Sequence, residues 1–413
     1  MTVLQQERTG PLVGYRVLDL SRVYAGPICG QMLADQGADV IKIEPPVGDE
    51  TRNFGVKLGE DRSTYFDGLN RNKRSIALDL SLPEGRNVLL RLLEGADVLI
   101  HNFKLGTMPR WGLGYEEVLS KRFPRLVQCT ITGFGNTGPL SGMPGYDVAI
   151  QGFTGLASIN GEAGSDGTKI AVPLIDNATG LSAASAILMA LLEREKSGKG
   201  QHVAVSLYNT ALTMLHPASG GYLATGKVPR PTGNTENWIA PYGAYRCADG
   251  RVFTGAGNNR SFAKLMAALG APELAQDVRF ATNKDRVENR AALDAAIEGL
   301  IEERTSDEVA TELLNAGLAA APFLNMEQAL SHPQVRANDM LIETEDYTGI
   351  GLPMHFLRTP GGYYRSPPRF AAHTGEILAD AGYGAEEIAA LVDQGAVIRE
   401  RKSIVAKNAE GGK

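Results

Sequence analysis

The chain has 413 residues, which is longer than a single hydrophobic core usually supports and predicts two domains or lobes. Its composition, 43% hydrophobic and 21% charged, is ordinary for a globular protein. Its formal net charge of −6 argues against a nucleic-acid partner, so any anionic ligand must be held by local basic groups. The three cysteines are widely spaced without a CxxC pair, which predicts a reducing compartment and no structural zinc site.

The N-terminal stretch MTVLQQERTG has no apolar core, so we expect no signal peptide and a cytoplasmic protein. Strand and helix then alternate through the first third. Helices are predicted from VYAGP to Gly37 and from Pro83 to Gly95. The strands are predicted at 15–20, 38–44, 74–80, 96–103 and 125–132. Repeated strand–helix–strand units predict a doubly wound, mostly parallel, Rossmann-like sheet, whose ligands bind beyond the carboxyl ends of the strands.

Asp176 follows the long irregular segment 133–167 and precedes a helix that is apolar nearly all round. Taken alone, it fits an N-cap, which accepts hydrogen bonds from the first free helix N–H groups. Three features favour a reactive carboxylate instead: small flanking residues, a buried helix dipole pointing at the carboxylate, and the irregular segment before it. The apolar part of the helix, 181–192, is too short to span a bilayer.

The remainder is predicted to form a second domain and a return to the first. A crossing loop is predicted at 221–243, a hairpin with an Asp-Gly turn at 245–257, and three helices after it, the last with a capping box of Thr305 and Glu308. Two short C-terminal helices precede a polar tail that we expect to fray. The predicted division is a large α/β domain at 1–224, a small α+β domain at 225–330, and a return segment at 331–413 that completes the large domain.

Familiar chemical motifs are missing from the sequence. No GxSxG elbow, Walker A loop or HExxH motif occurs, and the six scattered histidines predict no metal site. The stretch TGAGNNR lacks the last glycine of a dinucleotide fingerprint, because Arg260 stands there, and it fits a hairpin-to-helix loop better.

A set of ordered stretches nevertheless carries a family resemblance. They are RVLDLSRVYAGP, LADQGADVIKIEPP, LNRNKRSIALDLSLPEGR, ADVLIHNFKLGTMPRWGLGYE, TGFGNTGPLSGMPGYDVAIQGFTGL, VPLIDNATGLSAA, REKSGKGQHVAVSLYNT, GLAAAPFLNMEQALSHPQVRANDM and HTGEIL. Together they cover almost the whole chain. The chain resembles the class III CoA transferases, the family of formyl-CoA transferase, carnitine CoA-transferase and the 2-methylacyl-CoA racemases.

The resemblance implies that Asp176 is the nucleophile that attacks an acyl-CoA thioester to form an anhydride, and then carries CoA as an aspartyl thioester. Its substrates would be an acyl-CoA and a small carboxylic acid, with dicarboxylic acids among the candidates, and no cofactor would be permanently bound. Backbone N–H groups near Gly180 or at 255–257 are candidates to stabilise the oxyanions. Family members form an interlocked homodimer, which the segments 208–245 and 330–370 would suit.

By family position, the predicted CoA contacts are Tyr24, Ala25, Leu78, Asn102, Phe103, Lys104, Arg110, Tyr146 and Asp147. The acid pocket is expected to include Gly255, Gly257, Asn258 and Trp238. A basic cluster of Arg71, Lys73 and Arg74 fits either phosphate contacts or a solvated loop face. Two departures leave the phosphate geometry open: relatives often have Arg where Lys104 stands before Leu105, and some have a basic residue in place of Pro45.

Two other functions remain as alternatives. Racemases of the family exchange a proton with an Asp and the His of a GHD motif, but here the motif is GYD, and Tyr146 is a poor proton shuttle at neutral pH. A CoA-binding protein without turnover, in which Asp176 only caps its helix, is the second alternative.

Overall fold

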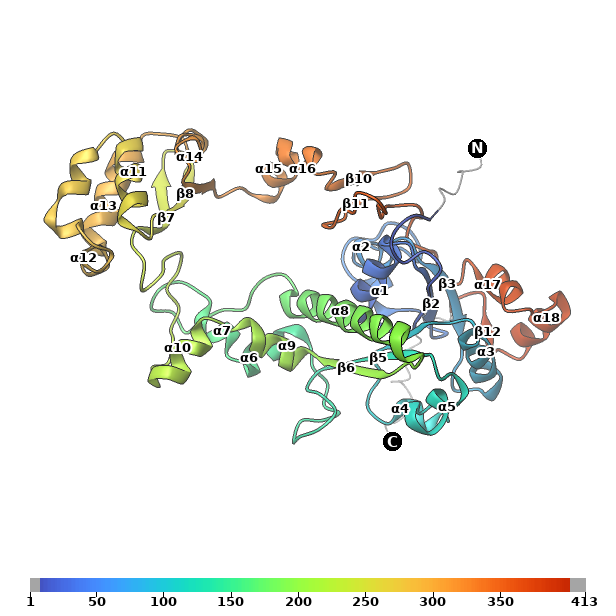
Figure 1. The fold of residues 1–413 in the computed structure, drawn as a ribbon. Helices are drawn as coiled ribbons and strands as arrows, with labels where there is room; N and C mark the ends of the chain where they lie inside the picture. Colours follow the sequence, from blue (N-terminus) through green and yellow to red (C-terminus); the bar gives the residue numbers. More distant parts are fainter. Residues whose placement is uncertain (1–7, 402–413) are drawn as a thin grey trace, which may run out of the picture. The chain divides into compact units, whose positions relative to one another are not determined.

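The computed structural model describes residues 8–401 of the chain, which form two compact units (Figure 1). The first unit holds the chain up to Thr154, Ala171–His216 and the chain from Arg336 onward, and the second holds Gly155–Ile170 and Pro217–Val335. The second unit is therefore larger than the predicted 225–330, because it also includes residues 155–170, 217–224 and 331–335.

A seven-stranded sheet in the order β12-β3-β2-β1-β4-β5-β6 forms the centre of the first unit. All neighbouring pairs are parallel except β12 with β3, which confirms a mostly parallel α/β sheet. The strands are β1 Arg16–Asp19, β2 Asp39–Glu44, β3 Arg74–Leu78, β4 Val98–His101, β5 Val127–Thr132, β6 His202–Ser206 and β12 Val397–Ile398. β6 and β12 are additional to the predicted strands. The order reverses between β1 and β4, where a doubly wound sheet opens a crevice for ligands.

The helices of the first unit follow the predicted alternation. They are α1 Ala25–Asp35, α2 Thr64–Asn70, α3 Pro83–Leu93, α4 Thr107–Arg110, α5 Ser120–Arg122, α6 Asp147–Phe153, α8 Leu174–Ser197, α9 Leu207–Met214, α17 Thr374–Asp380 and α18 Ala385–Asp393, with the turns η1 Glu50–Asn53 and η2 Tyr115–Leu119. A short hairpin, β10 Leu341–Glu343 with β11 Thr348–Ile350, lies on the return segment.

Helix α8 lies against α1 and against β5 and β6 (Figure 1). A Cβ placed on Gly180 would come within 2.3 Å of Ile28 and 2.8 Å of the Ala25 carbonyl oxygen, so only glycine lets the two helices approach this closely. Helix α8 has 24 residues, and a window of 18 of them has a mean hydropathy of 1.4, so α8 is long and apolar enough to cross a membrane by length and composition. Its buried face, however, packs like that of a core helix.

The basic cluster Arg71, Lys73 and Arg74 is neither a phosphate site nor a solvated loop face. The three side chains are buried and form ion pairs of 2.7–2.8 Å with Asp35, Asp19 and Asp39, respectively. The return segment covers them, since the Asn72 N–H donates to the carbonyl oxygen of Arg365 at 2.9 Å. Their positive charges are neutralised by these buried ion pairs.

The second unit is an antiparallel sheet packed on helices. Its strands are β7 Tyr242–Cys247, β8 Gly250–Gly255 and β9 Ala319–Pro322, and the first two form the predicted hairpin. The helices are α7 Leu156–Ile159, α10 Ala218–Thr225, α11 Asn259–Ala268, α12 Asn283–Glu288, α13 Arg290–Ile301, α14 Ser306–Asn315 and α15 Met326–Ser331, with turns η3 Pro272–Gln276 and η4 Val278–Phe280; α16 Pro333–Ala337 spans the boundary between the units. The predicted capping box of α14 is present.

Candidate active site

The turn after β1 is joined to the end of β4 at the switch point of the sheet. Asn102, directly after β4, accepts a hydrogen bond from the Arg22 N–H at 2.9 Å and donates one to the Arg22 carbonyl oxygen at 2.7 Å. The predicted CoA contact Asn102 therefore uses its amide to hold a neighbouring backbone, although it also lines the cavity described below.

This turn contains a strained residue. Val23 has φ 71°, a left-handed conformation that is a rare outlier for a β-branched side chain and costs of order 1–3 kcal/mol. Its N–H faces the Asp49 carboxylate at 3.4 Å, and Asp49 is paired with the fully buried Lys42 at 2.8 Å. Burial alone would raise the pKa of Asp49, but Lys42 and the hydrogen bonds from Thr51 lower it to about 2. A permanently charged anchor thus fixes the turn that ends at Tyr24.

The aspartate that caps the apolar helix α8 is Asp147, not Asp176, for which a cap was one of the two interpretations of the sequence. α8 begins at Leu174, so Asp176 lies inside the first turn and does not cap it. Asp147, the first residue of α6, accepts hydrogen bonds from the N–H groups of Ile175 at 2.7 Å and of Asp176 at 3.1 Å. Asp147 therefore satisfies the helix end and leaves the carboxylate of Asp176 available for chemistry.

The Asp176 carboxyl group is mostly buried and has no hydrogen-bond partner among residues 8–401. Burial, and after it the negative charge of Asp147, raises its pKa to about 7. A carboxylate of this basicity is a stronger nucleophile than an ordinary aspartate, yet is substantially ionised at neutral pH.

Two tyrosines border the carboxyl group. Asn177 Nδ2 donates to the Tyr24 hydroxyl oxygen at 2.9 Å, and the ring of Tyr65 meets that of Tyr24 edge-on at 5.7 Å between centroids. Burial raises the pKa of Tyr24, although the hydrogen bond from Asn177 partly lowers it. Burial is also the main cause that raises the pKa of Tyr65 to about 12, and the negative charge of Asp176 adds to it. Both phenols therefore stay neutral beside the Asp176 carboxyl group.

A cavity of about 220 Å³ brings most of the predicted contacts together around Asp176. Its lining includes Tyr24, Ala25, Asn102, Phe103, Lys104 and Tyr146. Leu78 lines an adjoining cavity of about 340 Å³, which also contains Phe103, Lys104 and Trp111. Arg22, which the sequence did not single out, lines both cavities and adds a second cation to that of Lys104.

Other predicted residues lie elsewhere. Arg110 is outside these linings, and its guanidinium donates to the Thr107 hydroxyl at 3.2 Å. Asp147 is buried and is not among the lining residues of either cavity; its carboxylate accepts the two N–H groups at the start of α8, and its contact with CoA stays a prediction. The N–H of Gly180 lies inside α8, where it is used by the helix and does not face an oxyanion.

The predicted acid-pocket residues belong to the second unit. Gly255 ends β8, and a Cβ placed on Gly257 would meet Ile239 at 3.5 Å. Asn258 caps α11 by accepting from the Ser261 N–H at 2.8 Å, and the Trp238 carbonyl oxygen accepts from Asn283 at 2.7 Å. Within residues 8–401, no three His, Cys, Asp or Glu side chains are grouped to hold a metal ion.

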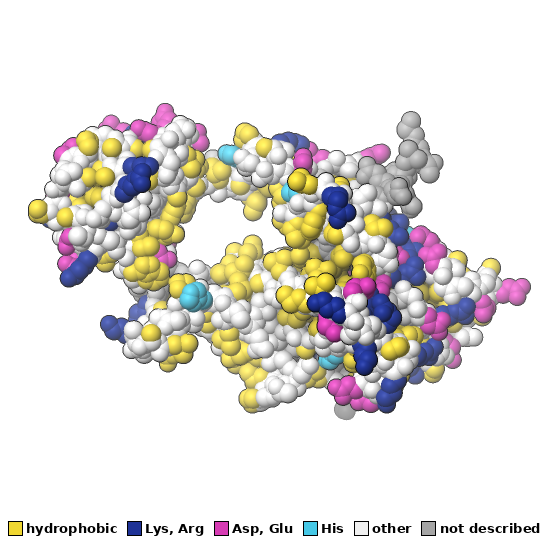
Figure 2. Space-filling view, in the orientation of Figure 1, with side chains coloured by type: hydrophobic (Ala, Val, Ile, Leu, Met, Phe, Trp, Pro, Cys, Tyr) yellow, Lys and Arg dark blue, Asp and Glu magenta, His cyan; other side chains and the backbone are white. Residues whose placement is uncertain are grey.

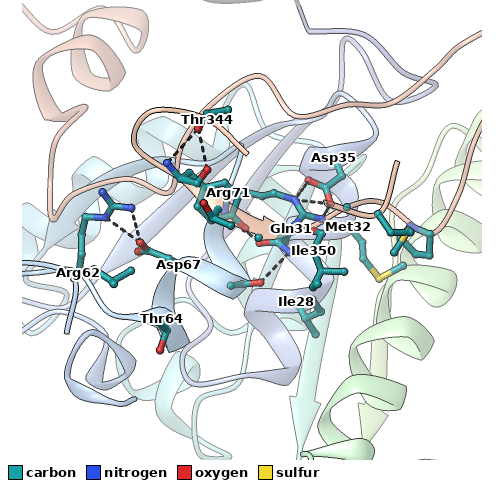
Figure 3. A pocket seen from close by; sticks show the side chains of 18 of the residues that line it. Ile28, Gln31, Met32, Asp35, Arg62, Thr64, Asp67, Arg71, Thr344 and Ile350 are labelled. Carbon is teal, nitrogen blue, oxygen red and sulfur yellow. Dashed lines mark hydrogen bonds and ion pairs between the residues drawn. The ribbon is translucent and has the colours of Figure 1, made fainter. Parts of the chain in front are cut away.

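Tyr24 also lines a larger cavity of about 1070 Å³, which Figure 3 shows from close by. α1 contributes Ile28 and Met32 to its wall, and α8 contributes Asn177 and Leu181. Farther away, Arg62 and Arg71 pair with Asp67 and Asp35 at 2.7 Å each, so these charges are already neutralised (Figure 3).

We expect Asn102→Ala to lower kcat roughly tenfold to a hundredfold, because the strained turn loses both hydrogen bonds and Tyr24 shifts from its place beside Asn177. Steady-state kinetics with an acyl-CoA donor measures this. Lys104→Ala is the control, since it removes a cavity cation without touching the turn and should raise the KM for the donor more than it lowers kcat. A variant at Asn102 that changed only KM would show that the residue contacts ligand and does not position the turn.

The fold and the site define an α/β protein with a mostly buried carboxyl group of raised pKa near the switch point of its sheet, in a cation-lined cavity. Residues 12–374 match the model of CoA-transferase family III, and the chain belongs to this family. It is 38% identical to a succinate–glutarate CoA-transferase of Agrobacterium fabrum over 90% of this chain and 96% of that protein. It is 34% identical to the human succinyl-CoA:glutarate CoA-transferase over 94% and 90% of the two chains.

The solved structures agree. A CAIB/BAIF family protein from Brucella suis superposes with a TM-score of 0.82 at 40% identity, over 91% of this chain and all of that chain. The protein is therefore a CoA-transferase, and CoA thioesters are its substrates.

Proposed function

We propose that this CoA-transferase exchanges CoA between short dicarboxylic acids by acylation of Asp176. The observation that carries the mechanism is the mostly buried carboxyl group of Asp176, which has no hydrogen-bond partner in the described part of the chain and whose pKa of about 7 combines ionisation with high basicity. Support for the substrate class comes from the relatives, which are named for succinate, glutarate and D-citramalate.

The exchange proceeds in balanced steps. The Asp176 carboxylate attacks the thioester carbonyl, the C–S bond breaks, and CoA leaves as thiolate while a mixed anhydride forms. The thiolate attacks the aspartyl carbonyl of the anhydride, which releases the donor acid and leaves an aspartyl-CoA thioester. The acceptor carboxylate then displaces CoA to form a second anhydride. Attack by the thiolate on the acceptor carbonyl yields the new acyl-CoA and restores the carboxylate.

CoA lies across the two adjoining cavities in this proposal. Lys104 and Arg22 line both cavities and supply the positive charge that phosphates need in an acidic protein. Leu78, Phe103 and Trp111 provide apolar and aromatic surface for the adenine. The thioester end then reaches Asp176 in the smaller cavity.

We also propose a homodimer, interlocked as the family resemblance implies. The outer face of α8 exposes apolar side chains, and hydrophobic residues gather over it in Figure 2. Leu188, Met189 and Leu192 are 43%, 70% and 64% exposed, which is a surface that a second copy would cover. Light scattering on the purified protein tests the dimer.

Incubation with succinyl-CoA tests the mechanism. The intact protein should gain the mass of a covalent adduct that hydroxylamine removes, and peptide mapping should place it on Asp176. Added glutarate should then yield glutaryl-CoA. An adduct on another residue, or transfer without any adduct, would contradict the proposal. A 2-methylacyl-CoA in deuterated water, without an acceptor acid, should show no exchange at Cα; exchange there would favour a racemase.

A further inference from the structure

Tyr24 is the side chain that the two cavities share among their described lining residues. One of the two is the cavity of about 220 Å³ that contains Asp176. The other is the cavity of about 1070 Å³ along α1 and α8. Because Tyr24 borders both, its ring can act as a wall between Asp176 and the larger space.

This wall is held in place from three directions. The strained Val23 and the two hydrogen bonds of Asn102 fix the backbone before it. Asn177 holds the hydroxyl group at 2.9 Å, and the Tyr65 ring packs edge-to-face with it at 5.7 Å between centroids. A surface tyrosine without such support would swing aside on the nanosecond scale.

Apolar side chains line the part of the larger cavity that follows Tyr24 along α1 and Asn177 along α8. Ile28 and Met32 stand about one and two helical turns after Tyr24 on α1, so they continue the same face. Leu181 stands about one turn after Asn177 on α8 and lines the same cavity. The paired groups Arg62–Asp67 and Arg71–Asp35 line the same cavity (Figure 3).

We propose that Tyr24 is a specificity-determining residue that restricts the acyl group on Asp176 to short chains by closing off the apolar path along Ile28, Met32 and Leu181. This inference rests on the proposed acylation of Asp176. Without the ring, the tail of a longer acyl group enters the larger cavity and buries its methylenes against the three side chains.

The test compares wild type and Tyr24→Ala with acetyl-, butyryl-, hexanoyl- and octanoyl-CoA and one fixed acceptor acid. Wild-type kcat/KM should fall beyond butyryl-CoA. In the variant, the ratio of hexanoyl to butyryl activity should rise roughly tenfold over the wild-type ratio, because each buried methylene is worth about fourfold. A variant that loses activity equally on all four donors would overturn the inference.

Two control variants isolate the cause. Tyr24→Phe loses the bond to Asn177 but keeps the ring, so its chain-length profile should match wild type. The double variant Tyr24→Ala/Met32→Asp places a charge in the opened path and should lose the gain on hexanoyl-CoA. If Tyr24→Ala does not fold, Tyr24→Val provides the same comparison.

The inference and the proposed function fail separately. Absence of a covalent adduct on wild type would refute acylation of Asp176. An adduct on wild type together with an unchanged chain-length profile in Tyr24→Ala would refute only the role of Tyr24.

Discussion

Asp176→Asn should abolish CoA transfer, with a loss of about 10⁴-fold or more, because the amide cannot attack a thioester and no neighbouring side chain can replace it. The neighbouring carboxylate of Asp147 already accepts hydrogen bonds from two backbone N–H groups, and both nearby tyrosines remain protonated. Initial rates of glutaryl-CoA formation, followed by chromatography, measure the loss.

The same variant should still bind CoA, because the cations Lys104 and Arg22 are untouched. Calorimetric titration with CoA provides this control and shows that the cavity is intact. Asp176→Glu, which keeps the charge but moves it by one methylene, should retain only a trace of activity. Transfer by Asp176→Asn at more than about a hundredth of the wild-type rate would show that another group carries the acyl chain.

Stability should move in the opposite direction to activity. The folded-state pKa of Asp176, about 7, lies above its usual value of 3.8, so the folded protein retains a proton that the unfolded chain releases between these pH values. Wild type therefore loses stability as pH rises from about 4 to about 7, and the loss is then complete. The neutral amide of the Asp176→Asn variant avoids this cost, which has an upper limit of about 4 kcal/mol.

Urea unfolding at pH 5 and pH 8 tests the linkage. We expect the stability advantage of Asp176→Asn over wild type to be larger at pH 8 than at pH 5. An advantage that is the same at both pH values would mean that the nucleophile titrates as an ordinary aspartate.

The sheet could be predicted because each of its early strands brings several apolar residues together in a short run, most of them next to glycine or proline. The sequence did not predict β6 because most of its side chains alternate between exposed and half-buried positions. It did not predict β12 because this strand contains only Val397 and Ile398. Both strands lie at the edges of the sheet.

The site shows a different limit. The assignment of Asp176 as the nucleophile rests on the family resemblance and stays a prediction, because its neighbours in sequence fit an N-cap as well. Its freedom from capping depends on Asp147, which lies in a separate helix. Likewise, the charges of Arg71, Lys73 and Arg74 look like a basic patch until distant aspartates are seen to neutralise them. Pairings between residues far apart in the chain leave no local pattern.

Asp147 is the second position where a large effect is expected. Asp147→Ala removes the acceptor from the buried N–H of Ile175 and from that of Asp176. An unsatisfied buried N–H costs about 1–3 kcal/mol, and loss of a helix cap costs about 1 kcal/mol, so we expect the free energy of unfolding to fall by about 2–4 kcal/mol. Urea unfolding at pH 7 measures this change.

Asp147→Asn separates the cap from the charge. Its amide oxygen can still accept a hydrogen bond, so stability should fall by less than in the Ala variant. Both variants remove the negative charge that helps to raise the pKa of Asp176, so that pKa should drop below about 7 in each. The acid limb of the kcat profile against pH should then move to lower pH in both variants.

The two variants together distinguish support of the helix from control of the nucleophile. If the acid limb moves equally in both while stability differs, Asp147 acts on Asp176 through its charge as well as through the helix end. If the acid limb moved only in the Ala variant, the shift would come from loss of order in the first turn of α8 and not from the lost charge. An unchanged limb in both would show that burial alone sets the basicity of the nucleophile, since burial is the larger cause of its raised pKa.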